Sequence, residues 1–283
     1  MLSILIPTYN YNSVPLVTEL HKQCNDSGIT YEILVFDDDS SEEFKIVNRA
    51  INNLSNCTYK ELELNIGRSA IRNMLAKSAK FDNLIFLDCD VLPKSNDFIS
   101  TYLNNLDKDI IYGSVTNTLE KPQKPKRLRW LYTKKREQKS ECSSNFYIKK
   151  VIILQNTFDE SIDKYGYEDV LFFSSIKKNG FIISSLNNPV IHLDNESASI
   201  FINKVETSLK TLKELIDKGN LNETNSKIYY YYKIIDSCGL KGLLKLFFKT
   251  LNPLMIKNFN SSSPSLFLFD IYRLGYFSII NTK

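Results

Sequence analysis

The chain has 283 residues, of which 43% are hydrophobic and 24% charged, and its formal net charge is +4. This composition is typical of a soluble globular protein with a sizeable core, and the mildly basic charge alone does not indicate nucleic-acid binding. Five scattered cysteines without a Cys-x-x-Cys pair, and only two histidines, argue against a structural zinc site and for free thiols in the cytosol.

The sequence carries no recognisable targeting or membrane-spanning segment. Residues 1–7 lack the basic region of a secretory signal and are too short for its apolar part. No uncharged apolar run reaches the roughly 18 residues that a membrane span needs. We therefore expect the protein to stay in the cytoplasm.

Apolar segments of strand length alternate with helical patterns over the first 90 residues. The expected strands are 2–6, stopped by Pro7, then 31–36, 59–64 and 84–87. The expected helices are 14–24, one starting near Ser40, and 69–80. Such alternation predicts an α/β protein with a parallel-dominated sheet covered by helices on both faces. Gly-rich dinucleotide and P-loop patterns are missing, so those two nucleotide-binding classes lose their main support.

The last of these strands ends in two carboxylates, Asp88 and Asp90. Alternate residues of an extended chain point the same way, so the two side chains can converge while Cys89 faces the other side. Open α/β sheets bind their ligands at the carboxyl ends of the strands. Two carboxylates there suit Mg²⁺ or Mn²⁺, which bind a few protein oxygens together with substrate phosphates. A solvated acidic turn is the alternative.

The middle of the chain is less regular. A helix is expected near 97–106, and strands are expected at 109–115, 143–148, 181–185 and 190–193. The basic segment 120–141 is interpreted either as a lid or acceptor-binding loop that attracts phosphate, or as a solvated surface loop. Farther along, the acidic pair Glu168 and Asp169 precedes a helix that stops at Gly180.

After about residue 200 the pattern becomes helical, which predicts two domains, 1–198 and 199–283. Within the second, the stretch 239–251 places three lysines on one face of an otherwise apolar helix. Such a helix either lies on a membrane surface or packs against another part of the protein. We favour membrane contact through 239–283, because more apolar residues follow at 266–269.

Five short segments, in this order, resemble family-2 glycosyltransferases of the GT-A fold. They are Pro7–Asn10, Asp37–Asp39, Gly67–Asn73, Asp88–Asp90 and Glu168–Asp169. The part from Phe158 to His192 is similar to the galactosyltransferase and chondroitin-polymerase branch. The resemblance covers roughly residues 1–195. It implies a Rossmann-like GT-A domain, with a mixed, mostly parallel sheet between helices, followed by a helical C-terminal extension.

The resemblance implies a nucleotide-sugar donor, UDP-linked in our interpretation. By it, Pro7, Thr8, Tyr9 and Asp38 hold the base and ribose. An aromatic ring can stack on the base, and a carboxylate can accept a hydrogen bond from the N–H group of the base. Arg68 matches an arginine near the nucleotide and begins a helix, where phosphate is favoured.

The same resemblance implies a Mn²⁺ or Mg²⁺ cofactor. Asp90 is the expected direct ligand, and His192 completes the shell. Asp88 is expected either in the metal site or directed toward the ribose or a metal-bound water.

Asp169 is the expected catalytic base, and Glu168 and Asn145 are expected to bind the acceptor. In an inverting transfer, one carboxylate takes the proton of the acceptor hydroxyl as its oxygen attacks the anomeric carbon. A helix amino terminus favours the ionised carboxylate and so weakens Asp169 as a base, but the group need only be deprotonated when the hydroxyl arrives.

Together these features predict an inverting, metal-dependent hexosyl- or N-acetylhexosaminyltransferase. Its acceptor is a glycan or lipid-linked glycan in surface polysaccharide synthesis, it has no nucleic-acid partner, and it contacts the inner face of the plasma membrane. A sugar-nucleotide pyrophosphorylase is one alternative, although it would need a Gly-rich loop near the amino terminus. A non-catalytic nucleotide-sugar binding protein on the same scaffold is the other.

Overall fold

The computed structural model describes residues 1–118, 120–138, 140–193 and 196–281. These described residues form two compact units, each made of several chain segments. Of the described residues, 1–118, 136–138, 140–163 and 172–193 belong to the sheet unit, and 120–135, 164–171 and 196–281 belong to the helical unit. Two segments that precede residue 198 thus belong to the same unit as the C-terminal helices. The predicted division into 1–198 and 199–283 did not include this arrangement.

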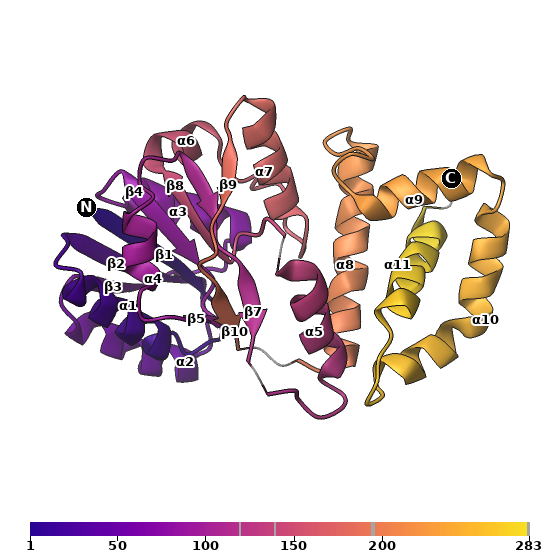
Figure 1. Ribbon diagram of the computed structural model, residues 1–283, viewed down its shortest axis with the longest axis horizontal. Helices are drawn as coiled ribbons and strands as arrows, with labels where there is room; N and C mark the ends of the chain where they lie inside the picture. The colour runs from indigo at the N-terminus through magenta and orange to yellow at the C-terminus, as the bar shows by residue number, and fades with distance from the viewer. Residues whose placement is uncertain (119, 139, 194–195, 282–283) are drawn as a thin grey trace. The chain divides into compact units, whose positions relative to one another are not determined.

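Within the described residues, the sheet unit contains a seven-stranded sheet in the order β3-β2-β1-β4-β8-β6-β9 (Figure 1). Neighbouring strands are parallel except at β8, which runs antiparallel to both β4 and β6. The predicted mixed, mostly parallel α/β sheet is confirmed. Its strands are β1 (Leu2–Thr8), β2 (Tyr31–Asp37), β3 (Cys57–Glu61), β4 (Asn83–Leu87), β6 (Ile110–Tyr112), β8 (Asn145–Lys149) and β9 (Ile183–Ser185).

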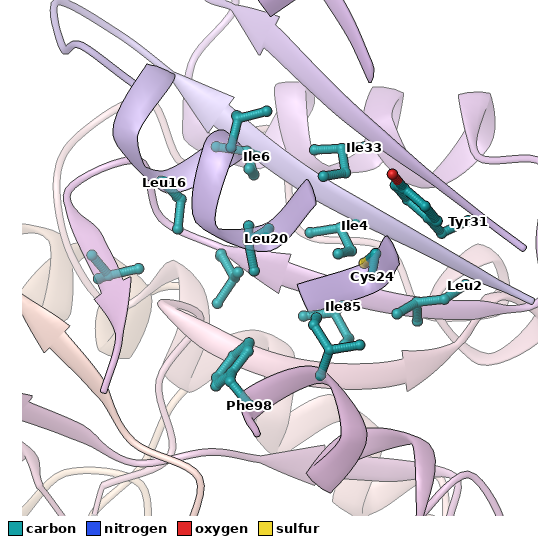
Figure 2. Close-up of a cluster of buried hydrophobic side chains, with 14 of the residues drawn as sticks. Leu2, Ile4, Ile6, Leu16, Leu20, Cys24, Tyr31, Ile33, Ile85 and Phe98 are labelled. Atoms are coloured by element: carbon teal, nitrogen blue, oxygen red, sulfur yellow. The ribbon is translucent and has the colours of Figure 1, made fainter. Parts of the chain in front are cut away.

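Helices cover both faces of this sheet, because alternate residues of its strands point into two apolar cores. Leu2, Ile4 and Ile6 of β1 pack with α1 and α4, as Figure 2 shows for α1. Leu5 faces the opposite core, which includes residues of α3, α6 and α7. Burial on both faces explains why the strands are continuous apolar runs. The helices are α1 (Val14–Asp26), α2 (Glu42–Asn48), α3 (Arg68–Ser78), α4 (Phe98–Leu103), α6 (Lys150–Gln155) and α7 (Glu168–Lys178), with a 3-10 turn at Arg49–Asn53.

A second sheet, of three strands within the described residues, has the order β5-β10-β7. It consists of β5 (Val91–Pro93), β10 (Val190–His192) and β7 (Val115–Asn117). The predicted single strand 109–115 is therefore wrong, because β6 and β7 belong to different sheets. Gly113 lies at the break, where a side chain would collide with that of Asn145. The expected stop at Pro7 is also wrong, since β1 continues through it to Thr8.

The helical unit is organised around its last helix, α11. Phe269, Tyr272 and Phe277 of α11 are buried, and α11 contacts α8, α9 and α10 (Figure 1). The predicted C-terminal helices are confirmed. Serine side chains cap α8, α9 and α11, each accepting a backbone N–H of the first turn. The bounds are α5 (Arg127–Tyr132), a π-helical turn (Thr133–Glu137), α8 (Ala198–Asp217), α9 (Lys227–Ser237), α10 (Lys241–Phe259) and α11 (Leu266–Ile280).

The basic segment is not the loop that its charge suggested. Residues 127–137 are helical, and Leu128 and Trp130 are buried in the helical unit. Two of its cations have structural contacts: Arg129 Nε lies 3.7 Å from Glu196 Oε1, and Lys134 lies over the Trp130 ring. The apolar residues at helical spacing, rather than the local charge, therefore determine the structure of this segment.

No helix in the described part of the chain combines the length and the hydropathy needed to cross a membrane.

Candidate active site

Three neighbouring strands bring predicted site residues to one edge of the sheet. β2, β1 and β4 lie side by side and parallel. Their carboxyl ends lead to Asp38, Thr8 and Asp88. The N–H of Asp38 donates to the carbonyl oxygen of Thr8 at 2.8 Å, which extends the β1–β2 pairing into the loops. This edge is where open α/β sheets bind ligands.

The carboxylate of Asp88 is held between a buried arginine and a serine. Nη2 of Arg72 donates to Oδ1 at 2.6 Å, and Oγ of Ser144 donates to Oδ2 at 2.6 Å. Arg68 is farther away, with its Nη2 atom 4.0 Å from Oδ2. The Arg72 side chain is buried, whereas that of Arg68 is 47% exposed. Arg72 therefore fixes Asp88, and Arg68 presents its guanidinium to solvent at the start of α3.

Helix α3 also anchors a segment that is distant in sequence. Asn73 donates to the carbonyl oxygen of Phe158 at 2.9 Å and to Oε1 of Glu160 at 2.8 Å, and it accepts from the N–H of Phe158. From the sequence, Arg72, one turn after Arg68, was expected to be structural and to pair with an acid, and Asn73 and Ser144 were assigned no role. Arg72 and Asn73 are adjacent polar residues on the apolar side of α3, and this pattern could have indicated that their side chains make buried contacts. The sequence contains no comparable pattern for Ser144.

The small sheet brings His192 to Asp90. β10 pairs antiparallel with β5, which places His192 opposite Val91, and the N–H of Leu193 donates to the carbonyl oxygen of Asp90 at 2.9 Å. In this register, Nε2 of His192 lies 3.3 Å from Oδ2 of Asp90. No group of three or more His, Cys, Asp or Glu side chains suited to a metal ion occurs among the described residues. The site thus offers a carboxylate–imidazole pair.

Cys89 turns away from this pair, as strand alternation predicted. Its side chain packs against the apolar core beneath α1. Burial, reinforced by the charges of Asp90 and Asp88, raises the pKa of the Cys89 thiol, so it stays protonated. A neutral thiol leaves the metal-binding chemistry to the carboxylates and the imidazole.

The carboxylate of Asp38 clamps the turn that precedes α3. Oδ1 accepts from the N–H of Ile66 at 2.7 Å, and Oδ2 accepts from the N–H of Gly67 at 3.0 Å. Burial raises the pKa of Asp38, and these two N–H donors oppose that effect. A carboxylate can accept about four hydrogen bonds, so this clamp leaves acceptor capacity for a ligand.

The residues around the end of β1, which were predicted together to hold the nucleotide, differ in their exposure to solvent. The Tyr9 side chain is 54% exposed and can stack on a planar ring. Thr8 is buried, and its Oγ1 atom lies 2.8 Å from Oγ of Ser13. Pro7 lies within β1. The side chain of Thr8 is therefore buried within the loop, whereas the ring of Tyr9 is accessible.

Asn145 is placed differently from the prediction that it binds the acceptor. It is fully buried in β8, where its Oδ1 atom accepts from the hydroxyl of Tyr102 at 2.7 Å. Its Nδ2 atom donates to the carbonyl oxygens of Ser114 and Asn188 at 3.2 and 2.9 Å. These bonds tie β8 to the chain segments around the small sheet. Asn145 is a structural residue without surface for a sugar.

Glu168 and Asp169 form the first turn of α7, in the part of that helix that belongs to the helical unit. Glu168 is buried. Asp169 is half-buried, and its Oδ1 atom accepts from the N–H of Val170 at 2.8 Å. A half-buried carboxylate at a helix start is placed where a ligand hydroxyl could reach it.

The turn before Glu168 is fixed by α8 and by the cap of α9. Gly166 has a φ of +96°, and a Cβ atom there would collide with the side chain of Ser208. Oγ1 of Thr211 donates to the carbonyl oxygen of Tyr165 at 3.1 Å, and the Tyr167 hydroxyl lies 3.4 Å from Oγ of Ser226. The C-terminal helices therefore position the two carboxylates.

Residues 3–175 match the sequence model of the family described as Glycosyl transferase family 2. The match covers more than half of the chain. The chain belongs to glycosyltransferase family 2.

Known proteins resemble this chain in sequence or in fold. A stretch of 94 residues is 36% identical to chondroitin synthase of Escherichia coli, and it covers 32% of this chain but 14% of that much longer relative. The mannosyltransferase PcManGT from Pyrobaculum calidifontis, in complex with GDP-Man and Mn²⁺, matches with a TM-score of 0.58 and 12% identity over 100% of this chain and 88% of that one. S. aureus TarS 1–349, in complex with UDP-GlcNAc, matches with a TM-score of 0.51 and 18% identity over 97% and 90%. The GT-A-like fold expected for this chain is confirmed.

The link between Arg72 and Asp88 in this family 2 chain can be tested by a double-mutant cycle. Arg72→Met leaves a mostly buried carboxylate without its cation, and breaking a buried pair in this way costs roughly 3 kcal/mol or more. We expect Arg72→Met to lower the free energy of unfolding by about that amount, and Arg72→Met/Asp88→Asn to lose less than the sum of the single changes. Denaturation by guanidinium measures the free energy of unfolding of the wild type, the two single variants and the double variant.

Arg49 is the matched control, because its pair with Glu61 is about half exposed. Arg49→Met should lower the free energy of unfolding much less than Arg72→Met does, because solvent screens an exposed pair. Strictly additive losses for Arg72 and Asp88 would mean that the two side chains are not coupled.

The turn before Glu168 gives a second prediction. Gly166→Ala adds both an unfavourable positive φ and a collision with Ser208, whereas Gly219→Ala, at a φ of +76°, adds the backbone strain alone, since no atom lies within 4 Å of its Cβ position. We expect Gly219→Ala to cost about 1 kcal/mol and Gly166→Ala clearly more. Equal shifts in the midpoint of thermal unfolding would show that the turn yields easily to the collision.

Proposed function

We propose that this chain is an inverting, metal-dependent glycosyltransferase that takes its sugar from a nucleotide sugar, UDP-linked in preference. The observation that supports this most is the position of Asp90 and His192. Their side chains lie 3.3 Å apart, beside the carboxylate of Asp88 that Arg72 holds. This constellation occurs in a family 2 chain, at the sheet edge where ligands bind.

The donor is proposed to lie along the carboxyl ends of β1, β2 and β4. The exposed ring of Tyr9 would stack on the base, and the remaining acceptor capacity of Asp38 would be directed to the nucleoside. Arg68, at the start of α3, would meet the diphosphate with a positive charge and a helix amino terminus. Solved structures of similar fold, in complex with GDP-Man and with UDP-GlcNAc, support a nucleotide sugar as the ligand class.

The residues around Asp90 fit a divalent cation. Asp90 and His192 would hold it, while Asp88, whose charge is offset by Arg72, would direct its remaining acceptor capacity to the ribose or to a metal-bound water. A site with two protein ligands is what a cation needs when substrate phosphates supply the rest of its shell. An imidazole ligand favours a transition-metal ion, so we propose Mn²⁺ before Mg²⁺. When bound, the cation would neutralise the charge that builds on the leaving diphosphate.

Asp169 is proposed as the catalytic base, with Glu168 beside it for the acceptor sugar. As the acceptor oxygen attacks the anomeric carbon, Asp169 would take its proton, and the bond from that carbon to the diphosphate would break. Arg68 would stabilise the departing phosphate oxygens. The turn that carries both carboxylates is held by Ser208, Thr211 and Ser226, which favours a single orientation.

We propose a glycan or lipid-linked glycan in surface polysaccharide synthesis as the acceptor, and a cytoplasmic location with contact to the membrane through 239–283. The chondroitin synthase relative supports a polysaccharide acceptor. A pyrophosphorylase remains disfavoured because the segment Pro7–Asn10 contains no glycine. A non-catalytic nucleotide-sugar binding protein differs from our proposal in lacking transfer, and the next two experiments distinguish it.

Asp169→Asn keeps the shape of the side chain but removes its basicity. We expect UDP release from a panel of UDP-sugars to fall about 100-fold or more, because general-base catalysis contributes about that much. The dissociation constant for UDP should stay within about threefold by isothermal titration. Asp217→Asn, at an exposed residue of α8, is the control and should leave both unchanged. Equal losses of release and UDP binding would remove Asp169 as the base.

The two histidines of the chain provide a matched test of the metal site. His192→Gln removes the imidazole beside Asp90, while His21→Gln changes an exposed histidine that contacts Ser55. We expect Mn²⁺ to strengthen UDP binding to the wild-type protein and to His21→Gln, and to strengthen it at least about tenfold less in His192→Gln. UDP binding that is insensitive to Mn²⁺ and to EDTA in the wild type would favour the non-catalytic rival.

A further inference from the structure

Helix α10 is apolar on two opposite sides. Phe248, Met255 and Phe259 point inward and are buried in the helical unit, where Phe248 and Phe259 contact the rings of α11. The opposite side also carries large apolar side chains. These are exposed: Leu243 by 64%, Leu246 by 64%, Phe247 by 41% and Leu254 by 63%. A helix with two apolar faces is normally buried on both.

The exposed side chains form one continuous stripe. Leu243, Phe247 and Leu254 are spaced by four and seven residues, so they lie along one line of the helix, with Leu246 beside them. The stripe spans 12 residues, which is about 18 Å of helix. Single exposed apolar residues are common on protein surfaces, but an ordered row of large ones marks a binding surface.

The chain around this stripe is strongly basic. Residues 227–259 contain six lysines and one acidic residue, Asp236. Nζ of Lys241 lies 3.7 Å from Oδ1 of Asp236, so this one acidic residue is already paired with a lysine. For Lys245, Lys249 and Lys257, no carboxylate partner is present among the described residues. The apolar stripe is thus bordered by positive charge that nothing in the same segment neutralises.

We propose that the stripe Leu243/Leu246/Phe247/Leu254 of α10 inserts into the interface of an anionic lipid bilayer, with Lys245, Lys249 and Lys257 reaching its headgroups. This specifies the partner for the membrane contact proposed above, and it does not depend on the transfer reaction. An apolar row beside lysines is the pattern of interfacial helices. Pairing of this face with a second copy would bring like charges together, so the charge favours lipid over self-association.

The physical roles of the two residue types differ. The leucines and the phenylalanine would leave water for the acyl boundary, a gain that any bilayer provides. The lysines would be attracted to negatively charged headgroups by a force that falls off with salt. Binding should therefore require both an intact stripe and anionic lipid, and it should weaken as ionic strength rises.

Flotation of the full-length protein with vesicles tests this directly. One set contains phosphatidylcholine with about one third phosphatidylglycerol, and the other contains phosphatidylcholine alone. We expect binding to the anionic set, and at least tenfold weaker binding for Leu243→Gln/Phe247→Gln/Leu254→Gln. The matched control replaces three exposed apolar residues of the sheet unit, as Ile46→Gln/Val151→Gln/Ile182→Gln, and should bind as the wild type does.

A second variant isolates the charge. Lys245→Gln/Lys249→Gln should weaken binding to anionic vesicles severalfold and reduce its dependence on salt. Equal binding of the wild type to both vesicle sets, or to neither, overturns the proposal. So does a dimer in sedimentation that the α10 triple variant converts to a monomer, since the face would then join two copies. Thermal unfolding confirms that each variant is folded, and UDP release by the triple variant separates this test from that of the transfer reaction.

Discussion

The geometry of the candidate site depends on the buried guanidinium of Arg72. A guanidinium removed from water is costly unless its N–H groups find acceptors. Nη2 of Arg72 donates to the carboxylate of Asp88 and Nη1 to the carbonyl oxygen of Arg68, one turn earlier on α3, whereas Nε has no acceptor among the described residues. With Ser144 on its other oxygen, Asp88 has one orientation, and its charge is largely neutralised. In the proposed metal site, Asp90 would therefore supply the negative charge.

The second constraint is the pairing that joins Asp90 to His192, which lie 102 residues apart in sequence. Strands of three residues are too short to be stable by themselves. This small sheet persists because Val91, Val115 and Val190 are all buried in the main core under α1. The spacing between carboxylate and imidazole thus rests on apolar packing rather than on attraction between the two groups. Such a scaffold would hold the two proposed metal ligands in place before any ion arrives.

The sequence allowed prediction of features that depend on a local pattern of residues. It did not allow prediction of features that depend on which strands pair. The apolar run before Asp88 and Asp90 predicted a strand that ends at two carboxylates. Asn145 looked equally suited to a ligand, but its direction depends on β8 pairing with β4 and β6, which places it inward against Tyr102. No local signal could show that Ser144, the next residue back, would contact Asp88. The link from His192 to Asp90 came only through resemblance to a family.

The helical unit has two proposed roles, which truncation cannot separate. Ser208, Thr211 and Ser226 hold the turn that bears Glu168 and Asp169, so removal of residues 199–283 would take away the support of the candidate base. Loss of activity in a shortened chain would then say nothing about lipid binding. The exposed stripe belongs to the outward side of α10, whereas the turn contacts α8 and the cap of α9. Substitutions on α10 can therefore alter the surface while the turn keeps its contacts.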